Sequence, residues 1–283
     1  MSVRIVVDSA CDLGKEKASE LGVEFISLKT IFGEKEYLDG DELSGKEFYE
    51  KLIESDELPT TSQATPFDFE KVFQSIVDEG DTAVCITLSS KLSGTNQSAN
   101  IAAADFEGKV FVVDSENVTV GEQILVLYAV ALRNQGRCAE EIFDLLNEHK
   151  KNIRVIALLD TLEYLKKGGR ISSAAAFAGT LLSIKPVVAV KDGEVVILGK
   201  ARGSKNGSNF LNQQIANGNG INFDMPYSLA YTGLSDELLQ KYIKDSAHLY
   251  QDCTDTLPIC IVGSTIGTHV GPGAIAVAFF ERT

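Results

Sequence analysis

The stretch of the chain with the clearest chemical potential is the hydroxyl-rich loop at residues 88–95, LSSKLSGT. It follows the apolar run 82–87, which predicts a buried strand, and precedes 96–104, which predicts a helix rich in small residues. Ligands of open α/β sheets bind where a strand runs into a loop and a helix start. The free N–H groups of that helix start favour an anion, and Ser93 could cap the helix and, with Thr95, donate hydroxyl hydrogen bonds. The loop therefore predicts a site for a small, negatively charged group.

His269 is the second residue that could contribute to an anion site. Of the three histidines, it alone lies in a Gly/Pro-rich segment, residues 267–273, which predicts a loop between two apolar strands. A buried imidazole can donate a hydrogen bond to an anion, and its charge changes near neutral pH. The same segment also suits an ordinary turn, so the residues alone leave both interpretations open.

A third polar segment runs from residue 58 to residue 66 and contains Thr61. It ends in a helix start signal, with Thr65 as N-cap and Pro66 at the first helical position. Its Ser/Thr side chains either solvate a loop or contact a ligand, and the sequence does not decide between the two.

Ser93 could also act as a nucleophile, which requires an adjacent base held by a third group. His269 could supply the base and Asp8, Asp114 or Asp160 the third group, although nothing in the spacing demands it. The G-x-S-x-G, H-E-x-x-H and P-loop motifs do not occur. Widely separated histidines and the lack of a paired-cysteine motif predict no metal site.

The predicted elements that must position these residues alternate between strands and helices in the first half of the chain. Strands at 3–7, 23–28, 82–87, 109–113 and 154–159 predict a mostly parallel sheet with helices on both faces and polar strand ends at one edge. Beyond residue 159, a hairpin around Asp192-Gly193 and further strands and helices predict a mixed α+β unit. We therefore expect an α/β protein with an N-terminal domain at residues 1–158, a C-terminal domain at residues 159–283, and a ligand site between them.

Composition narrows the class of protein. The chain has 283 residues, 44% hydrophobic and 23% charged, with no predicted signal peptide or membrane span. Five dispersed cysteines predict the reducing cytoplasm. A net charge of −14 argues against nucleic acid as a partner. Residues 150–205, however, hold 11 Lys/Arg and 4 Asp/Glu, a net charge of +7 that either forms a solvated face or steers an acidic or phosphate-bearing partner.

Six motifs, in order along nearly the whole chain, resemble those of the DegV family of bacterial fatty-acid-binding proteins. They are residues 61–63 (TSQ), 89–95 (SSKLSGT), 114–115 (DS), 162–171 (LEYLKKGGRI), 185–186 (KP) and 266–273 (IGTHVGPG). One departure is Ala64, where the family often has proline.

The resemblance implies a two-domain α/β fold with a long-chain fatty acid buried between the domains. It implies that the fatty acid carboxylate is held by Thr61, Ser93, the backbone N–H of Gly94 and His269. The bound fatty acid would be the ligand, and no other cofactor is implied. Apolar and small residues of 159–182 and 274–279 are expected along the acyl tail.

The resemblance further implies a non-catalytic role as the lipid-carrying subunit of a fatty acid kinase. Such a subunit presents the carboxylate to a separate ATP-using partner, which makes the acyl phosphate. Arg170 and Arg202 are similar to the basic positions that family members use to dock the kinase, and both lie in the +7 segment. Transient contact with a membrane surface is compatible with this role. The alternative that remains is a stand-alone acyl hydrolase or transferase with Ser93 as nucleophile.

Overall fold

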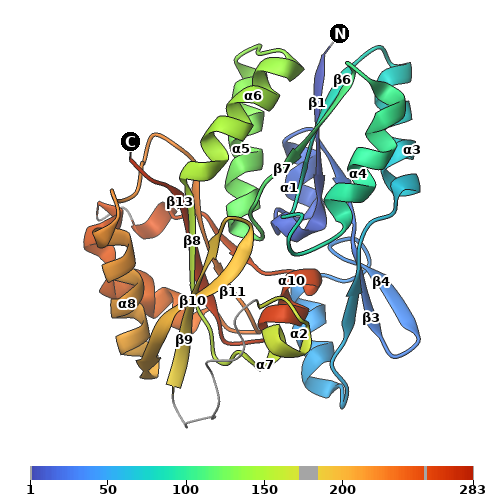
Figure 1. Ribbon diagram of the computed structural model, residues 1–283. Helices are drawn as coiled ribbons and strands as arrows, with labels where there is room; N and C mark the ends of the chain where they lie inside the picture. Colours follow the sequence, from blue (N-terminus) through green and yellow to red (C-terminus); the bar gives the residue numbers. More distant parts are fainter. Residues whose placement is uncertain (1, 172–183, 252–253, 283) are drawn as a thin grey trace.

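The structure of the protein is a computed structural model that describes residues 2–171, 184–251 and 254–282. The ribbon shows two larger sheets with helices around and between them (Figure 1). The small-residue helix that the sequence predicts at 172–182 lies outside the described residues.

The first sheet is the predicted parallel sheet. It has the strand order β2-β1-β6-β7, and all three neighbouring pairs are parallel. Its strands are β1 (Val3–Asp8), β2 (Val23–Ile26), β6 (Thr82–Thr87) and β7 (Val110–Asp114). The α/β architecture and the position of these four strands are therefore confirmed.

Helices cover both faces of this sheet, as the apolar runs require (Figure 1). Successive side chains of a strand point to opposite faces, so a strand buried on both sides is apolar throughout. Ile5 and Val7 pack with α1, α5 and α6, whereas Val6 packs with α3 and α4. The helices of this half are α1 (Lys15–Glu20), α2 (Gly45–Glu54), α3 (Pro66–Asp78), α4 (Thr95–Ala103), α5 (Val120–Asn134) and α6 (Ala139–His149).

A small antiparallel sheet of order β4-β3-β5 projects from the first half. β3 (Lys29–Phe32) and β4 (Lys35–Leu38) form the hairpin expected around Gly33, and β5 (Thr60–Ser62) pairs with the other edge of β3. The sequence does not predict β5, because its three polar residues lack an apolar alternation. Pairing with β3 is what holds Thr61 in an extended strand.

The second sheet is mixed and has the order β10-β9-β8-β13-β11-β12. Its strands are β8 (Ile153–Leu158), β9 (Ile184–Lys191), β10 (Glu194–Arg202), β11 (Tyr227–Tyr231), β12 (Ile259–Ile261) and β13 (Ile275–Phe280). β11 and β12 are parallel, and the other four pairs are antiparallel. The expected mixed second unit, including the hairpin at Asp192-Gly193, is confirmed.

One strand is in a different sheet from the one that the sequence predicts. The apolar run at 154–159 predicts a further strand of the parallel sheet, but β8 pairs antiparallel with β13 and β9. An apolar run of this length fits a buried strand in either sheet, so its composition cannot identify its partners. The domain division at 158/159 stays a prediction, although β8, which it assigns to the first domain, pairs with strands of the second sheet.

Helix α5 lies between the two sheets and joins them through one continuous core. Ile124 and Leu125 of α5 pack in the same cluster as Ile5 of the first sheet and Ala278 and Phe280 of the second. The far face of the second sheet is covered by α8 and α9. Among the described residues of this half, the helices are α7 (Glu163–Lys167), α8 (Gly203–Asn217), α9 (Glu237–Asp245) and α10 (Ser264–Val270). Along the whole described chain, short 3-10 turns lie at Ser9–Cys11, Ala104–Phe106, Lys150–Asn152, Ala247–Tyr250 and Thr254–Thr256.

Candidate functional site

The segment around His269 is a short helix, α10, and not the loop that the sequence predicts. Its seven residues include Gly267 and four β-branched residues, all of which have low intrinsic helix propensity. In the fold, α10 lies against α2, α7 and the β3–β5 sheet (Figure 1). Tertiary contacts therefore stabilise a helix that the local sequence does not favour.

The N-terminus of α10 is held by two carboxyl groups from the first half of the chain. The Ser264 N–H and Oγ–H both donate to Asp39 Oδ1, at 2.8 and 2.7 Å. The Gly263 N–H donates to Asp12 Oδ1 at 2.8 Å. Ser9 Oγ donates to the second oxygen of Asp39 at 2.9 Å, which orients that side chain. Acceptors at this end of a helix satisfy N–H groups that lack partners within the helix.

The carboxyl groups beneath α10 are buried away from solvent. Burial, together with the nearby carboxyl of Asp39, raises the pKa of Asp12 to about 8. Burial likewise raises the pKa of Asp8 to about 7, and that of Glu122 well above its usual value. Asp8, Asp12 and Glu122 are thus buried carboxyl groups that ionise less readily than usual, and they do not form an exposed acidic patch.

α10 brings His269 against Thr61, as the resemblance implies. His269 Nε2 lies 2.9 Å from Thr61 Oγ1, and the two residues are 208 positions apart in sequence. The other ring nitrogen, Nδ1, is buried without a hydrogen-bond partner beside Gly168, where a side chain would collide with the ring. Burial, aided by the positive charge of Arg170, lowers the pKa of His269 to about 4. At neutral pH the imidazole is therefore uncharged and can donate one hydrogen bond.

Ser93 and Gly94 lie at the start of α4, and together with His269 they line one cavity. Ser93 Oγ is 2.9 Å from Thr95 Oγ1 and accepts from the Thr95 N–H at 3.2 Å. The N-cap residue is Gly94, one position later than predicted for Ser93. A Cβ on Gly94 would lie 2.1 Å from Gln63 Oε1, so a side chain at this position would displace the end of the Gln63 side chain.

The loop at residues 88–95 is held by the polar ends of neighbouring strands, as expected. The Leu88 N–H donates to Asp8 Oδ2 at 2.8 Å, and the Ser90 N–H donates to Asp114 Oδ1 at 3.2 Å. Ser89 Oγ donates to the carbonyl of Gly193, at the tip of the β9–β10 hairpin, at 2.7 Å. The loop is therefore fixed from both halves of the chain.

A cavity of about 420 Å³ opens between these elements. Its polar lining includes Thr61, Ser93, Gly94 and His269, so the structure brings all four predicted binding residues to one cavity. We call it the polar cavity. Its remaining lining residues are Leu28, Ser62, Gln63, Leu88, Leu92, Val118, Leu165, Arg170, Val195, Thr265, Ile266 and Val270.

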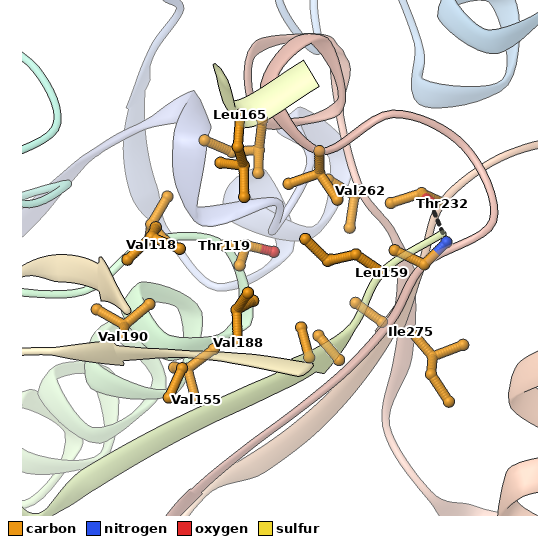
Figure 2. Close-up of a pocket in the computed structure, with 18 residues that line it drawn as sticks. Val118, Thr119, Val155, Leu159, Leu165, Val188, Val190, Thr232, Val262 and Ile275 are labelled. Atoms are coloured by element: carbon orange, nitrogen blue, oxygen red, sulfur yellow. Dashed lines mark hydrogen bonds between the residues drawn. The ribbon is translucent and has the colours of Figure 1, made fainter. Parts of the chain in front are cut away.

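A second cavity, of about 70 Å³, continues from the first toward the six-stranded sheet. Figure 2 shows its 18 lining residues, all of which are Ala, Val, Leu or Ile except Thr119 and Thr232. The Thr232 hydroxyl accepts a hydrogen bond from the Ala274 N–H at 2.7 Å and is thereby satisfied (Figure 2). We call this the apolar cavity. It shares Val118, Leu165, Val195, Ile266 and Val270 with the polar cavity, so the two are contiguous.

Several residues of the apolar cavity fall in the segments expected along an acyl tail. Leu159, Leu165, Ala274, Ile275 and Ala276 are among them. The sequence misses the contributions of other elements: Val118, Val155 and the valines of β9, at 188 and 190. A strand buried in any sheet has a similar run of valines, so the sequence alone does not show that these valines line a cavity. The pairing of β9 with β8 places them there.

The two predicted docking arginines lie in different places. Arg170 lies at the polar cavity, where its Nε donates to the Leu92 carbonyl at 3.2 Å and a terminal nitrogen donates to the Gly168 carbonyl at 2.6 Å. Arg202 is exposed at the end of β10, immediately before α8, and lines neither cavity. Both side chains are exposed, and Arg170 in addition forms part of the wall of the polar cavity.

The chain is similar over nearly its whole length to proteins of one family. A family model described as "Uncharacterised protein, DegV family" matches residues 2–282. The chain belongs to the DegV family. A DegV domain-containing protein of Caldanaerobacter subterraneus is 34% identical over 99% of both chains, and one of Clostridium acetobutylicum is 35% identical over 99% of both.

Solved structures of DegV family members share the whole fold. A structure describing fatty acid binding of a DegV family protein from Thermus thermophilus is 31% identical, covers 100% of both chains and has a TM-score of 0.85. The structure of DegV from Bacillus subtilis, described as a fatty acid binding protein, is 29% identical over 100% of both chains, with a TM-score of 0.82. A stearic-acid-binding protein from Eubacterium ventriosum is 27% identical, covers 99% of this chain and 98% of its own, and has a TM-score of 0.83.

Two further observations concern metals and membranes. In the described part of this DegV chain, no group of three or more His, Cys, Asp or Glu side chains is arranged to hold a metal ion. Among the same residues, no helix combines the length and the apolar character needed to span a bilayer.

Asp39→Asn tests the anchoring of α10. We expect the free energy of unfolding to fall by about 1–3 kcal/mol, because an amide replaces one of the two oxygens that accept from Ser264 and Ser9. Urea denaturation measures the change. Asp41→Asn is the matched control, since Asp41 pairs only with the exposed Lys15 and its loss should cost less than about 1 kcal/mol. Equal losses in the two variants would contradict the anchoring role.

The protonation of His269 provides a second test. Without ligand, the imidazole should titrate with a midpoint near 4, measured by NMR. The unfolded chain has a pKa of about 6.5, so His269 contributes stability above that pH which is lost as the pH falls from 6.5 toward 4. Arg170→Gln should raise the midpoint, because it removes a positive charge near the ring. A midpoint of 6.5 in the unliganded protein would show that the ring is not buried as described.

Proposed function

We propose that this protein binds one long-chain fatty acid, with the carboxylate at the polar groups of the polar cavity and the acyl tail running along the aliphatic residues of that cavity into the apolar cavity. The observation that carries the proposal is the contiguity of the two cavities, which share five lining residues. A ligand that fits both must be polar at one end and apolar along the rest. Relatives described as binding fatty acids share the fold over their whole length.

The carboxylate would be held by the hydroxyls of Thr61 and Ser93, the Gly94 N–H and the His269 Nε2–H. A carboxylate cannot be buried without partners, and hydrogen bonds to a charged group are stronger than those between neutral groups. Thr61 and His269 already lie within hydrogen-bond distance of each other, and Ser93 lines the same cavity. The neutral imidazole lets the site accept an anion without first burying a positive charge.

The tail would supply most of the affinity. Each methylene group that leaves water contributes about 0.8 kcal/mol, so a long acyl chain gains far more from burial than its head group does. The lining of the apolar cavity is aliphatic except for Thr119 and Thr232, and the Thr232 hydroxyl accepts a hydrogen bond from the backbone.

We further propose that the protein is the non-catalytic, lipid-carrying subunit of a cytoplasmic fatty acid kinase. In that role a separate ATP-using partner phosphorylates the bound carboxylate. Arg170 and Arg202 are both exposed and basic, as docking contacts for an acidic partner surface require.

The hydrogen bonds of Ser93 favour a carrier over an acyl hydrolase. Ser93 Oγ contacts Thr95, and no described histidine, lysine or carboxyl group accepts its proton. His269 Nε2 is directed at Thr61 instead, and Nδ1 has no carboxylate partner to orient the ring as a base. The nucleophile, base and orienting group of an acyl-transfer site are therefore not assembled.

Ser93→Ala and His269→Ala test the head-group site. Each should weaken the binding of palmitic acid to delipidated protein by about tenfold to a hundredfold, because one hydrogen bond to the carboxylate is lost. Titration calorimetry measures the affinity, and native mass spectrometry of protein purified from cells shows whether a fatty acid is retained. Ser90→Ala is the control, since Ser90 is exposed and lines neither cavity. Unchanged affinity in both test variants would contradict the assignment, and an empty protein that hydrolyses acyl esters would contradict the proposed function.

Arg202→Glu tests the docking surface. We expect fatty acid affinity to be unchanged, because Arg202 lies outside both cavities, while acyl phosphate formation with the kinase partner falls at least tenfold. Lys244→Glu makes the same charge change at another exposed cation, on α9, and should leave both measurements unchanged. Normal turnover with Arg202→Glu would remove Arg202 from the docking surface.

A further inference from the structure

Thr265 is a polar residue of the cavity wall to which neither the sequence nor the proposed function assigns a role. Its side chain is 3% exposed, and Oγ1 is buried without any hydrogen-bond partner. It lines the polar cavity together with Thr61, Ser93 and His269, but it does not line the apolar cavity. Buried hydroxyls are normally hydrogen-bonded, so an unpartnered one that faces a cavity indicates a ligand contact.

The neighbouring hydroxyls of α10 are all satisfied. Ser264 Oγ donates to Asp39, and Thr268 Oγ1 donates to the Ser264 carbonyl one turn earlier at 2.8 Å. Thr265 makes no such bond to the preceding turn, although threonines in helices commonly do. Its hydroxyl is thus the one on α10 that remains available to a molecule in the cavity.

The position of Thr265 relative to His269 defines which part of a ligand it can reach. Residues four apart on an α-helix lie on the same face, with Cβ atoms about 5–6 Å apart. A carboxylate that accepts a hydrogen bond from His269 therefore lies one helical turn from Thr265. An oxygen attached to the second or third carbon of the acid comes within hydrogen-bond reach of the Thr265 hydroxyl.

We propose that Thr265 makes the site selective for fatty acids that carry a hydroxyl group on the second or third carbon. This proposal rests on the proposed function, since it takes the carboxylate to be held at His269. An unsubstituted acid would place a methylene group against Oγ1 and leave it buried and unpaired, which disfavours that ligand. A hydroxy acid would exchange a hydrogen bond with Thr265 and fill the same space.

The experiment compares palmitic acid with 2-hydroxypalmitic and 3-hydroxypalmitic acids, using delipidated full-length protein and titration calorimetry. The wild-type protein should bind at least one hydroxy acid about tenfold more tightly than palmitic acid. Thr265→Val keeps the shape of the side chain and removes the hydroxyl. It should weaken binding of that hydroxy acid about tenfold, leave palmitic acid binding equal or tighter, and so abolish the preference.

Two further variants make the result specific to the hydroxyl. Thr265→Ser retains a hydroxyl and should keep the preference. Thr268→Val removes the neighbouring hydroxyl that bonds to Ser264 within the helix, and it should leave the preference unchanged. If the wild-type protein bound all three acids equally, or if Thr265→Val kept the preference, the role of Thr265 would be wrong while fatty acid binding stood. If it bound none of the acids, the proposed function itself would be wrong.

Discussion

The site depends on one constraint, the attachment of the N-terminus of α10 to two carboxyl groups of the first half of the chain. Asp39 and Asp12 accept the hydrogen bonds of Ser264 and Gly263, and the helix that starts there carries His269 at its other end. Without this attachment, a seven-residue helix with a glycine in its interior would not be stable. The same contacts join the first and second halves of the chain directly above the cavity.

The remaining elements bring the other contributions to that helix. β5 carries Thr61, the start of α4 carries Ser93 and Gly94, and the loop between β6 and α4 is fixed by strand ends and by the β9–β10 hairpin. Polar groups therefore come from the first half of the chain and from α10, whereas most of the apolar lining comes from the second half. This division gives a continuous cavity with one polar and one apolar end, the shape that an amphipathic ligand requires.

Much of this arrangement is predictable from the sequence. The parallel strands, the hydroxyl-rich loop at their edge and the hairpin at Asp192-Gly193 all have strong local signals, and the structure confirms them. The family motifs also identify Thr61, Ser93, Gly94 and His269, which the fold brings to one cavity. The sheet that β8 joins is not predictable, because an apolar strand is compatible with many partners. α10 and β5 are not predictable either, because their local propensities are weak and long-range hydrogen bonds stabilise them. Thr265 lies four residues before His269, and its significance becomes visible only once that segment is known to be helical.

The most direct test of the central claim is a crystal structure of the delipidated protein soaked with palmitic acid. The account predicts the carboxylate oxygens within hydrogen-bond distance of Thr61 Oγ1, Ser93 Oγ, the Gly94 N–H and His269 Nε2, and the acyl chain passing Val118 and Ile266 into the apolar cavity. A carboxylate bound elsewhere, or an acyl chain directed to solvent with the apolar cavity empty, would contradict it.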